Sequence, residues 1–252
     1  MLGRALRAPR TNALFLGRRA APGGATPPVA APAVIQTALS AQKEGEGTTN
    51  FSAALASDAT AGRTLLSFVG LRTSIFTGPV TGNNGNTHTQ QDSQAFPAPY
   101  TTYSMRSYRA YGVSGGSAHS VSGSKSSGAT EEVTTALIAL DGGSVVDSGV
   151  ALSAAAGAGA THTSPMVTTT GPALLVCIAS GTGDVNATAP TQTWPGNWTV
   201  RQSVAYSSAQ APNGHVPLYL ATREVASAGD YSVDVQVTIN EGLLFMIYAV
   251  QT

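Results

Sequence analysis

The sequence is poor in charged residues, in cysteine and in long apolar runs. Charged residues make up 10% of its 252 residues, whereas about a quarter is usual in a soluble protein. The single cysteine excludes a disulfide within the chain. No apolar run approaches the roughly 20 residues that a membrane-spanning helix needs, so we expect no membrane partner.

Glycine, serine, threonine and alanine take the place of the missing charges, with 28 glycines in all. This composition is typical of all-β proteins with neutral surfaces, such as secreted and virion proteins. Cys177 lies in the apolar run ALLVCIAS (173–180), which predicts a buried strand and an inert thiol. We expect no catalytic nucleophile at this position and no cofactor.

Charge is distributed unevenly along the chain, although the net charge is zero. The first acidic residue is Glu44, and the five arginines that precede it are Arg4, Arg7, Arg10, Arg18 and Arg19. From Lys43 onward the chain has 8 basic and 13 acidic residues, a net charge of −5. A basic arm therefore precedes a mildly acidic body. Five arginines suit an acidic partner surface but are too few to predict nucleic-acid binding.

Residues 1–45 are predicted to form an extended arm. Their Arg-rich, acid-free start fits the pattern of an organelle transit peptide, and APGGATPPVAAPAV (21–34) favours extended backbone. Such a segment has little apolar surface to offset an ordering cost of about 1–2 kcal/mol per residue. We therefore expect a neighbouring subunit to hold it as an anchor, and the alternative is a cleaved transit peptide. The predicted anchoring residues are Arg4, Arg7, Arg10, Leu14, Phe15, Leu16, Arg18 and Arg19.

Residues 46–252 are predicted to form an all-β body, because short β-rich runs alternate with turn sequences such as GNNGN, DGG and PNG. In YSVDVQVTI (231–239) the valines alternate with polar residues, which predicts one buried and one exposed face. The expected strands are 64–70, 101–112, 133–140, 173–180, 197–204, 216–223, 231–239 and 243–250.

The body also repeats itself at a nearly constant offset along the chain. AGRTLLSFVG (61–70) parallels TGPALLVCIAS (170–180), and EVTTALIAL (132–140) parallels EGLLFMIYAV (241–250). A fixed offset, here about 110 residues, indicates one supersecondary unit used twice. We expect a jelly-roll-like sandwich in one continuous domain, with halves at about 48–141 and 160–252, and two small sandwiches are the alternative.

The order of these motifs resembles that of β-sandwich modules in virion proteins of tailed bacteriophages. The shared features are a G-x-x-LL strand, a Gly-Asn turn, an aromatic strand, an alternating strand and a final ALIAL or FMIYAV strand. The resemblance covers roughly residues 50–252 and occurs among minor structural, head-fibre and tail-fibre proteins. It implies a virion location and transfers no catalytic residue.

Several short motifs match catalytic patterns only in isolation. GVSGG (112–116) places Ser114 in a G-x-S-x-G match, but a nucleophile elbow needs a following helix, and none is expected here. The carboxylates show no pairing, and Asp184 with Asn186 is more simply a solvated turn than a calcium site. Each histidine is predicted to be a solvated loop residue without metal-ligand spacing; they are His88, His119, His162 and His215.

Aromatic residues offer the one candidate ligand surface. TWPGNWTV (193–200) holds both tryptophans, of which Trp198 is predicted to pack inward and Trp194 to be available for stacking. The tyrosines of YTTYSMRSYRAY alternate irregularly, so some are expected to face outward. The predicted platform consists of Trp194, Tyr103 and Tyr108.

The sequence thus predicts a non-enzymatic virion structural protein, anchored by its arm to other virion proteins of capsid, collar or tail, and forming a homo-oligomer. One alternative is a receptor- or glycan-binding adhesin module for host surface glycans. A second alternative is an organelle-imported β-protein whose first residues are a transit peptide.

Overall fold

The computed structural model describes residues 29–42, 49–72, 76, 78–96, 101, 103–126, 133–154, 157–181, 191–204, 217–238 and 242–252. All regular elements in these ranges are β-strands, and all their pairings are antiparallel, which confirms the expected all-β class. The described part of the chain has no helix that is long and apolar enough to cross a membrane.

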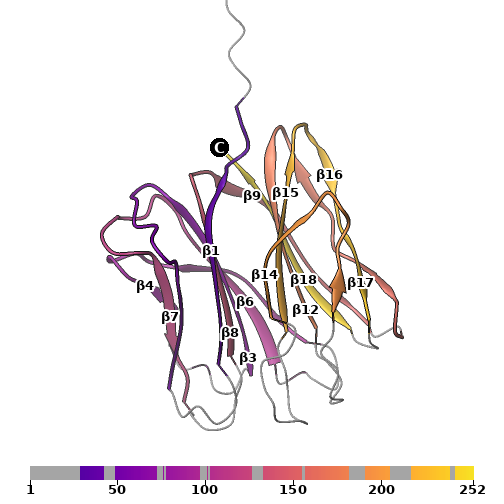
Figure 1. The fold of residues 1–252 in the computed structure, drawn as a ribbon, viewed down its shortest axis with the longest axis horizontal. Helices are drawn as coiled ribbons and strands as arrows, with labels where there is room; N and C mark the ends of the chain where they lie inside the picture. The colour runs from indigo at the N-terminus through magenta and orange to yellow at the C-terminus, as the bar shows by residue number, and fades with distance from the viewer. Residues whose placement is uncertain are drawn as a thin grey trace, which may run out of the picture.

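The strands form four stacked layers, seen from the side in Figure 1. Two five-stranded sheets lie in the middle. The first sheet contains, in spatial order, β1 (Val34–Gln42), β8 (Val133–Leu140), β3 (Thr64–Arg72), β6 (Tyr103–Ala110) and β5 (Thr89–Ala95). The second contains β14 (Thr199–Val204), β15 (Leu218–Val225), β12 (Ala173–Gly181), β18 (Leu243–Gln251) and β9 (Ser144–Ser153).

Smaller sheets cover the outer faces of this central pair. The first five-stranded sheet is covered by β2 (Asn50–Ala54), β7 (Ser120–Ser124) and β4 (Thr81–Gly82). The second is covered by β10 (Thr161–Thr163), β17 (Asp234–Val237) and β13 (Gln192–Thr193), together with the pair β11 (Val167–Thr169) and β16 (Gly229–Tyr231).

The central strands are apolar throughout because both of their faces are buried. In β18, Leu244 and Met246 face the other five-stranded sheet, whereas Phe245 and Ile247 face the outer layer. Strands β8 and β12 are likewise buried at every residue. Burial on both faces replaces the alternation of a half-exposed strand with a continuous apolar run. The runs predicted at 133–140, 173–180 and 243–250 correspond to these three strands.

The outer strand β17 shows the opposite pattern. Val233, Val235 and Val237 are buried, and Asp234 and Gln236 are exposed. This outcome confirms the two faces predicted from the alternation in YSVDVQVTI.

The layers enclose three apolar cores. One lies between the two five-stranded sheets and contains Phe68, Met105, Ile138, Met246 and Tyr248 among others. The other two lie between each five-stranded sheet and its own outer layer. The body is therefore two sandwiches packed face to face.

The two sandwiches follow one another in the chain. All described strands up to β8 belong to the first, and all from β9 onward belong to the second. The turn Asp141–Gly143 joins them. Each half begins with a strand that the predicted boundaries of 48 and 160 leave out, namely β1 in the first half and β9 in the second.

The predicted arm of residues 1–45 therefore includes a strand of the first sheet, because Val34–Gln42 pairs with β8 along its whole length. The eight predicted anchoring residues, between Arg4 and Arg19, lie outside the described residues. Just before β1, the Ala33 amide donates to Asp141 Oδ1 (2.7 Å), and Thr252 Oγ1 donates to the Ala30 carbonyl (3.0 Å). The chain thus enters the body beside its own C-terminus (Figure 1).

Candidate functional site

The predicted aromatic platform is not assembled in the structure. Tyr103 and Tyr108 have exposed fractions of 9% and 4%. Tyr103 packs in the core between the halves, and Tyr108 packs in the core of the first half. Tyr111, just after β6, is 41% exposed, which confirms the expectation that some tyrosines of this run face outward, but the two assigned to the platform are buried on opposite faces of β6. Tyr100 lies outside the described residues.

The two tryptophans lie in the second half and pack together, with ring centroids 5.8 Å apart and planes inclined by 51°. Trp198 is buried, as predicted, and Trp194 is half-buried against the same core. Tilted packing of this kind stabilises a core edge. Trp194 therefore has no partner from β6, which lies in the other half.

Three of the histidines are buried, which overturns the prediction of solvated loop residues. Their exposed fractions are 6% for His88, 0% for His119 and 1% for His162. His88 Nδ1 lies 3.3 Å from Ser67 Oγ, and His162 Nδ1 lies 2.7 Å from Ser153 Oγ. Gly82 leaves room for the imidazole of His88, because a methyl group at that position would lie 2.8 Å from its Nε2. His215 lies outside the described residues.

Burial makes two of these imidazoles weak bases. Desolvation, with a smaller contribution from His119, lowers the pKa of His88 to about 4. Desolvation also lowers the pKa of His162. Both rings are therefore uncharged at neutral pH.

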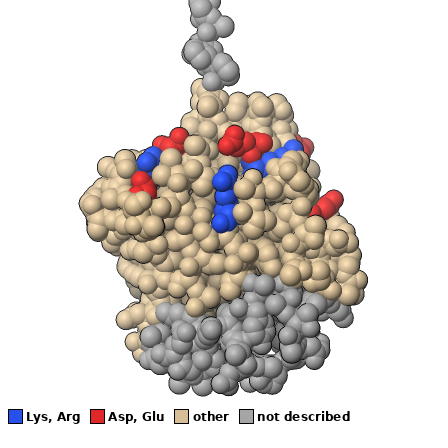
Figure 2. All heavy atoms as spheres, viewed as in Figure 1, with Lys and Arg blue, Asp and Glu red and all other residues tan. Residues whose placement is uncertain are grey.

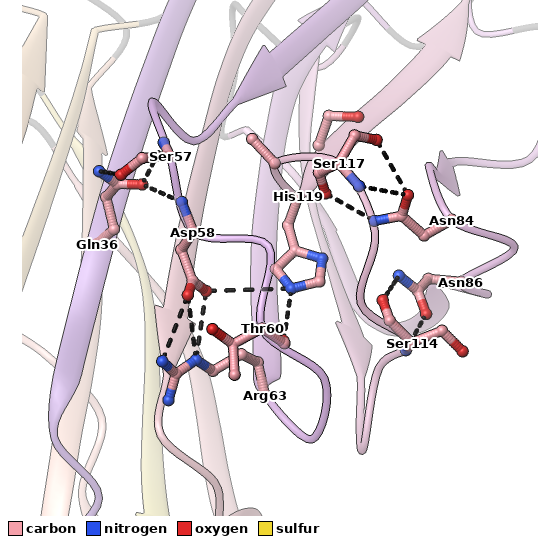
Figure 3. A network of polar contacts seen from close by, with 12 residues as sticks. Gln36, Ser57, Asp58, Thr60, Arg63, Asn84, Asn86, Ser114, Ser117 and His119 are labelled. Carbon is pink, nitrogen blue, oxygen red and sulfur yellow. Dashed lines mark hydrogen bonds and ion pairs between the residues drawn. The ribbon is translucent and has the colours of Figure 1, made fainter.

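His119 belongs to a polar cluster at one corner of the first half (Figure 3). Its Nε2 lies 2.9 Å from the Thr60 carbonyl and 4.0 Å from Asp58 Oδ2. Asp58 pairs with Arg63 at 3.3 Å, and Gln36 Oε1 accepts the Asp58 amide at 3.1 Å. The cluster thus ties the loop before β3 to strand β1.

Two asparagines of the GNNGN turn, Asn84 and Asn86, fasten a second loop, also shown in Figure 3. Asn84 accepts the Ser117 amide (3.1 Å) and donates to the Ser117 carbonyl (2.7 Å). Asn86 does the same with Ser114, at 2.7 and 3.2 Å. Each side-chain amide forms with the loop backbone the hydrogen bonds that a neighbouring strand would otherwise provide. These contacts fix the fold of residues 114–120 and involve no reactive group.

The G-x-S-x-G match at Ser114 lies in this fastened loop, directly before strand β7. A nucleophile elbow requires a strand that turns into a helix, and the described residues after Ser114 form a strand instead. The arrangement does not resemble an elbow. Cys177 is fully buried, and desolvation raises the pKa of its thiol well above the usual range.

The described carboxylates of the second half serve as local hydrogen-bond acceptors. Asp147 accepts the Thr168 amide at 2.7 Å, and Asp230 accepts the Thr168 hydroxyl at 2.7 Å. Within the described ranges, no three His, Cys, Asp or Glu side chains gather to hold a metal ion. Asp184 and Asn186 lie outside those ranges.

Among the described residues, two surface grooves are candidate binding sites. The first, of about 580 Å³, lies over the outer face of sheet β2–β7–β4. Its lining is neutral and rich in hydroxyl groups: Asn50, Phe51, Ser52, Gly78, Pro79, Thr81, Ser122, Gly123 and Ser124. We call it the hydroxyl groove.

The second groove, of about 370 Å³, lies where the chain enters the body. Its lining is apolar apart from one acid: Val29, Ala30, Ala31, Pro172, Glu224, Val225 and Ala226. We call it the arm-exit groove. Val29 is 61% exposed. On the face drawn in Figure 2, charged side chains gather toward this end of the body.

Comparisons with known proteins return no match to any family model, any curated protein or any solved structure.

Proposed function

We propose that the chain is a non-enzymatic structural protein of a larger particle, of the phage-virion type. In this proposal the basic N-terminal segment attaches the body to neighbouring subunits. The body then acts as a stiff module that decorates the particle or projects from it.

The entry of the chain into the body carries this proposal. Residues 29–33 are bonded to Asp141 and to Thr252, so the basic segment before them begins at one defined end of the body. Force or binding at that segment is transmitted to β1, which is paired with β8 over eight residue pairs. A segment with five arginines and no acid fits an acidic or carbonyl-rich surface.

Individual contacts of this kind are weak. An exposed ion pair contributes about 0–1 kcal/mol, so five arginines do not hold a module by themselves. Apolar burial of Leu14, Phe15 and Leu16 and repetition over many copies supply the rest. The arm-exit groove adds apolar surface at the same end.

Removal of residues 2–28 tests the proposal, because it ends before the residues bonded to the body. Particles are purified from cells that produce either chain, and the amount of bound protein is measured. We expect the shortened chain to keep its circular dichroism spectrum and to be absent from the particles. A chain with the five arginines replaced by lysines is the matched control and is expected to bind.

Two results would contradict the proposal. One is normal incorporation of the shortened chain. The other is a mature N-terminus near Ala21 in the natural protein, because that result would identify a cleaved transit peptide.

The hydroxyl groove favours a second candidate function, the binding of a neutral glycan. Its hydroxyl and amide groups suit sugar hydroxyls, and none of its lining residues is charged. Filling the groove with Ser122→Trp is expected to abolish retention on a glycan array, and Thr168→Trp on the second half serves as the control. Equal binding by both variants would refute this candidate.

A further inference from the structure

The two halves are built alike down to their irregularities. The first five-stranded sheet has the order β1-β8-β3-β6-β5, and the second has the order β9-β18-β12-β15-β14 when counted from its other edge. Phe68 pairs with Ala136, and the two residues at the repeat offset from them, Ile178 and Met246, pair with each other. The strand registers of the two halves are therefore equivalent.

The β-bulges of the edge strands also coincide. The pairing of β5 shifts between Gln90 and Asp92, and that of β14 shifts between Val200 and Gln202, at the same repeat offset. Bulges are local features that a chain retains rather than acquires repeatedly at matching places. We treat Asp92 and Gln202 as equivalent residues on this basis.

The halves meet like two subunits of a dimer. No described strand of one half pairs with a described strand of the other. The two sheets instead stack face to face through apolar side chains. Equivalent strands follow opposite orders across the interface, so that β1 of the first half lies against β14, the equivalent of β5, in the second. An interface in which the same face of each unit meets the other is isologous in type.

Polar contacts across this interface differ between its two ends. Tyr248 of the second half donates its hydroxyl to Asp92 Oδ2 (2.9 Å) and lies 2.6 Å from Ser107 Oγ, both in the first half. At the other end, Gln202 of the second half donates to Thr37 Oγ1 (2.9 Å) of the first. The interface is thus symmetric in backbone and asymmetric in chemistry.

We infer that each half specifically binds the other half, as two subunits of a dimer do, although both belong to one chain. The contact of Tyr248 with Asp92 and Ser107 selects this pairing over the pairing of two like halves. The counterpart of Tyr248 in the first half, at the repeat offset, is Ile138. Two first halves would therefore place the carboxylate of Asp92 against an isoleucine. A carboxylate without a donor opposes such an interface.

The pairing of two second halves is disfavoured for a related reason. Leu220 is the counterpart of Ser107. Leu220 pairs with Ile178 in the second half, Ser107 pairs with Phe68 in the first, and Ile178 and Phe68 are equivalent residues. A second copy of the second half would therefore offer leucine and the neutral amide of Gln202 where Tyr248 finds a hydroxyl and a carboxylate. Selection by unsatisfied polar groups is a general source of partner specificity.

The test uses the full chain with a protease site inserted between Gly142 and Gly143, where a side chain at Gly142 would meet open space. The folded protein is cleaved, and native mass spectrometry measures which fragments stay together. The fragments are then separated in denaturant, mixed and refolded. We expect one copy of each half in the product before and after refolding. Separation of the halves on cleavage, or pairing of like halves, would overturn the inference.

Variants test the selecting contact itself. Tyr248→Phe is expected to weaken association of the cleaved halves by about ten- to hundredfold, the effect of losing a hydrogen bond to a charged group. Tyr231→Phe is the matched control, because its hydroxyl bonds to Ser227 within the second half. Unchanged association in Tyr248→Phe would contradict the selecting role.

The double variant Asp92→Leu with Tyr248→Phe makes a sharper distinction. Replacing Asp92 and Tyr248 by apolar groups is expected to restore association, since no carboxylate remains without a donor and Ser107 Oγ still accepts the backbone amide of residue 92. It is also expected to allow pairs of first halves, which native mass spectrometry separates by mass. Restored association without such pairs would show that selection resides elsewhere and would contradict the inference.

Discussion

At the scale of single residues, Gly123 lies where the structure has no room for a side chain. A methyl group at this position would overlap the ring of Phe51, its pairing partner on strand β2. The residue lies in strand β7 and its outer side borders the hydroxyl groove. The absence of a side chain here therefore allows the ring of Phe51, on the neighbouring strand β2 of the same sheet, to lie across β7.

Gly123→Ala is expected to lower the free energy of unfolding by about 1–3 kcal/mol, the usual cost of adding volume to a filled core. Gly196→Ala is the matched control, because a methyl group there meets nothing within 4 Å. Urea denaturation of both variants measures the difference. Equal stability of the two variants would show that Phe51 moves aside freely.

His88 makes stability depend on pH. Its pKa is about 4 in the folded chain and 6.5 when solvated. His88 is therefore protonated below about pH 6.5 in the unfolded chain but only below about pH 4 in the folded chain. Stability is complete above this window and falls as the pH decreases through it.

The expected loss from His88 between pH 7 and pH 5 is about 2 kcal/mol. Denaturant unfolding at both pH values measures it. His88→Asn removes the titrating group. The stability of this variant is expected to fall by about 2 kcal/mol less between pH 7 and pH 5 than that of the parent chain, and this difference does not depend on the stability of the variant at pH 7. A slope identical to that of the parent chain would contradict the account.

At the scale of strands, the edges of the central sheets are irregular. Each of the four edge strands, β1, β5, β9 and β14, carries a bulge or an offset in its pairing with the neighbouring strand. Bulges at edges hinder pairing with strands of other molecules. Homo-oligomers of this protein, which remain a prediction, are therefore expected to use faces or ends of the body and not sheet edges.

Strand β1 is the element that separates arm from body. Its partly buried Val34 and Leu39 pack against the core between the halves. A chain that lacks residues 2–28 is expected to unfold cooperatively at the parent temperature. A chain that lacks residues 2–42 exposes β8 and this core, and is expected to aggregate or lose its cooperative transition. Calorimetry distinguishes these outcomes, and a stable chain without β1 would assign that strand to the arm.

The sequence predicts the apolar central strands well and the edge strands poorly. Residues 133–140 match β8 to the residue, because a run buried on both faces has an unmistakable composition. Strand β5, with the sequence TQQDSQA, has no apolar pattern that would predict it. Strand β5 is held by backbone pairing with β6 and by the hydrogen bond between Asp92 and Tyr248. Both contacts involve residues distant in sequence, so the local sequence pattern does not reveal them.

At the scale of the whole molecule, face-to-face stacking explains which site predictions are wrong. A single sandwich exposes the outer face of each sheet, so alternating tyrosines in one strand suggest an exposed platform. Here a second sandwich covers that face, and Tyr103 becomes part of the core between the halves. The burial of His119 likewise depends on loops distant in sequence, which join around Asp58 and Asn84.

The body also has a defined long direction. Strand β12 runs from Ala173, next to the arm-exit groove, to Gly181, whose pairing partner Leu243 begins β18. Eight steps of about 3.3 Å separate the ends of β12 by about 26 Å. Strand β3 begins at Thr64, which bonds to Gly143 beside Pro32 and Gln251 at the arm-exit end, and it ends at Arg72. Arg72 pairs with Tyr103, the first residue of β6, so Thr101, which is exposed, lies at the far end of the body, as does Gly181.

The orientation of the body on its particle tests the proposal most directly. Because the only native cysteine is buried and unreactive, Thr252→Cys and Thr101→Cys each create a single labelling site for maleimide-gold. Electron microscopy of labelled particles then measures the distance of each label from the particle wall. The proposal predicts gold at the wall for Thr252→Cys and gold farther out for Thr101→Cys. The reverse order, or gold at random distances, would contradict attachment through the N-terminal segment.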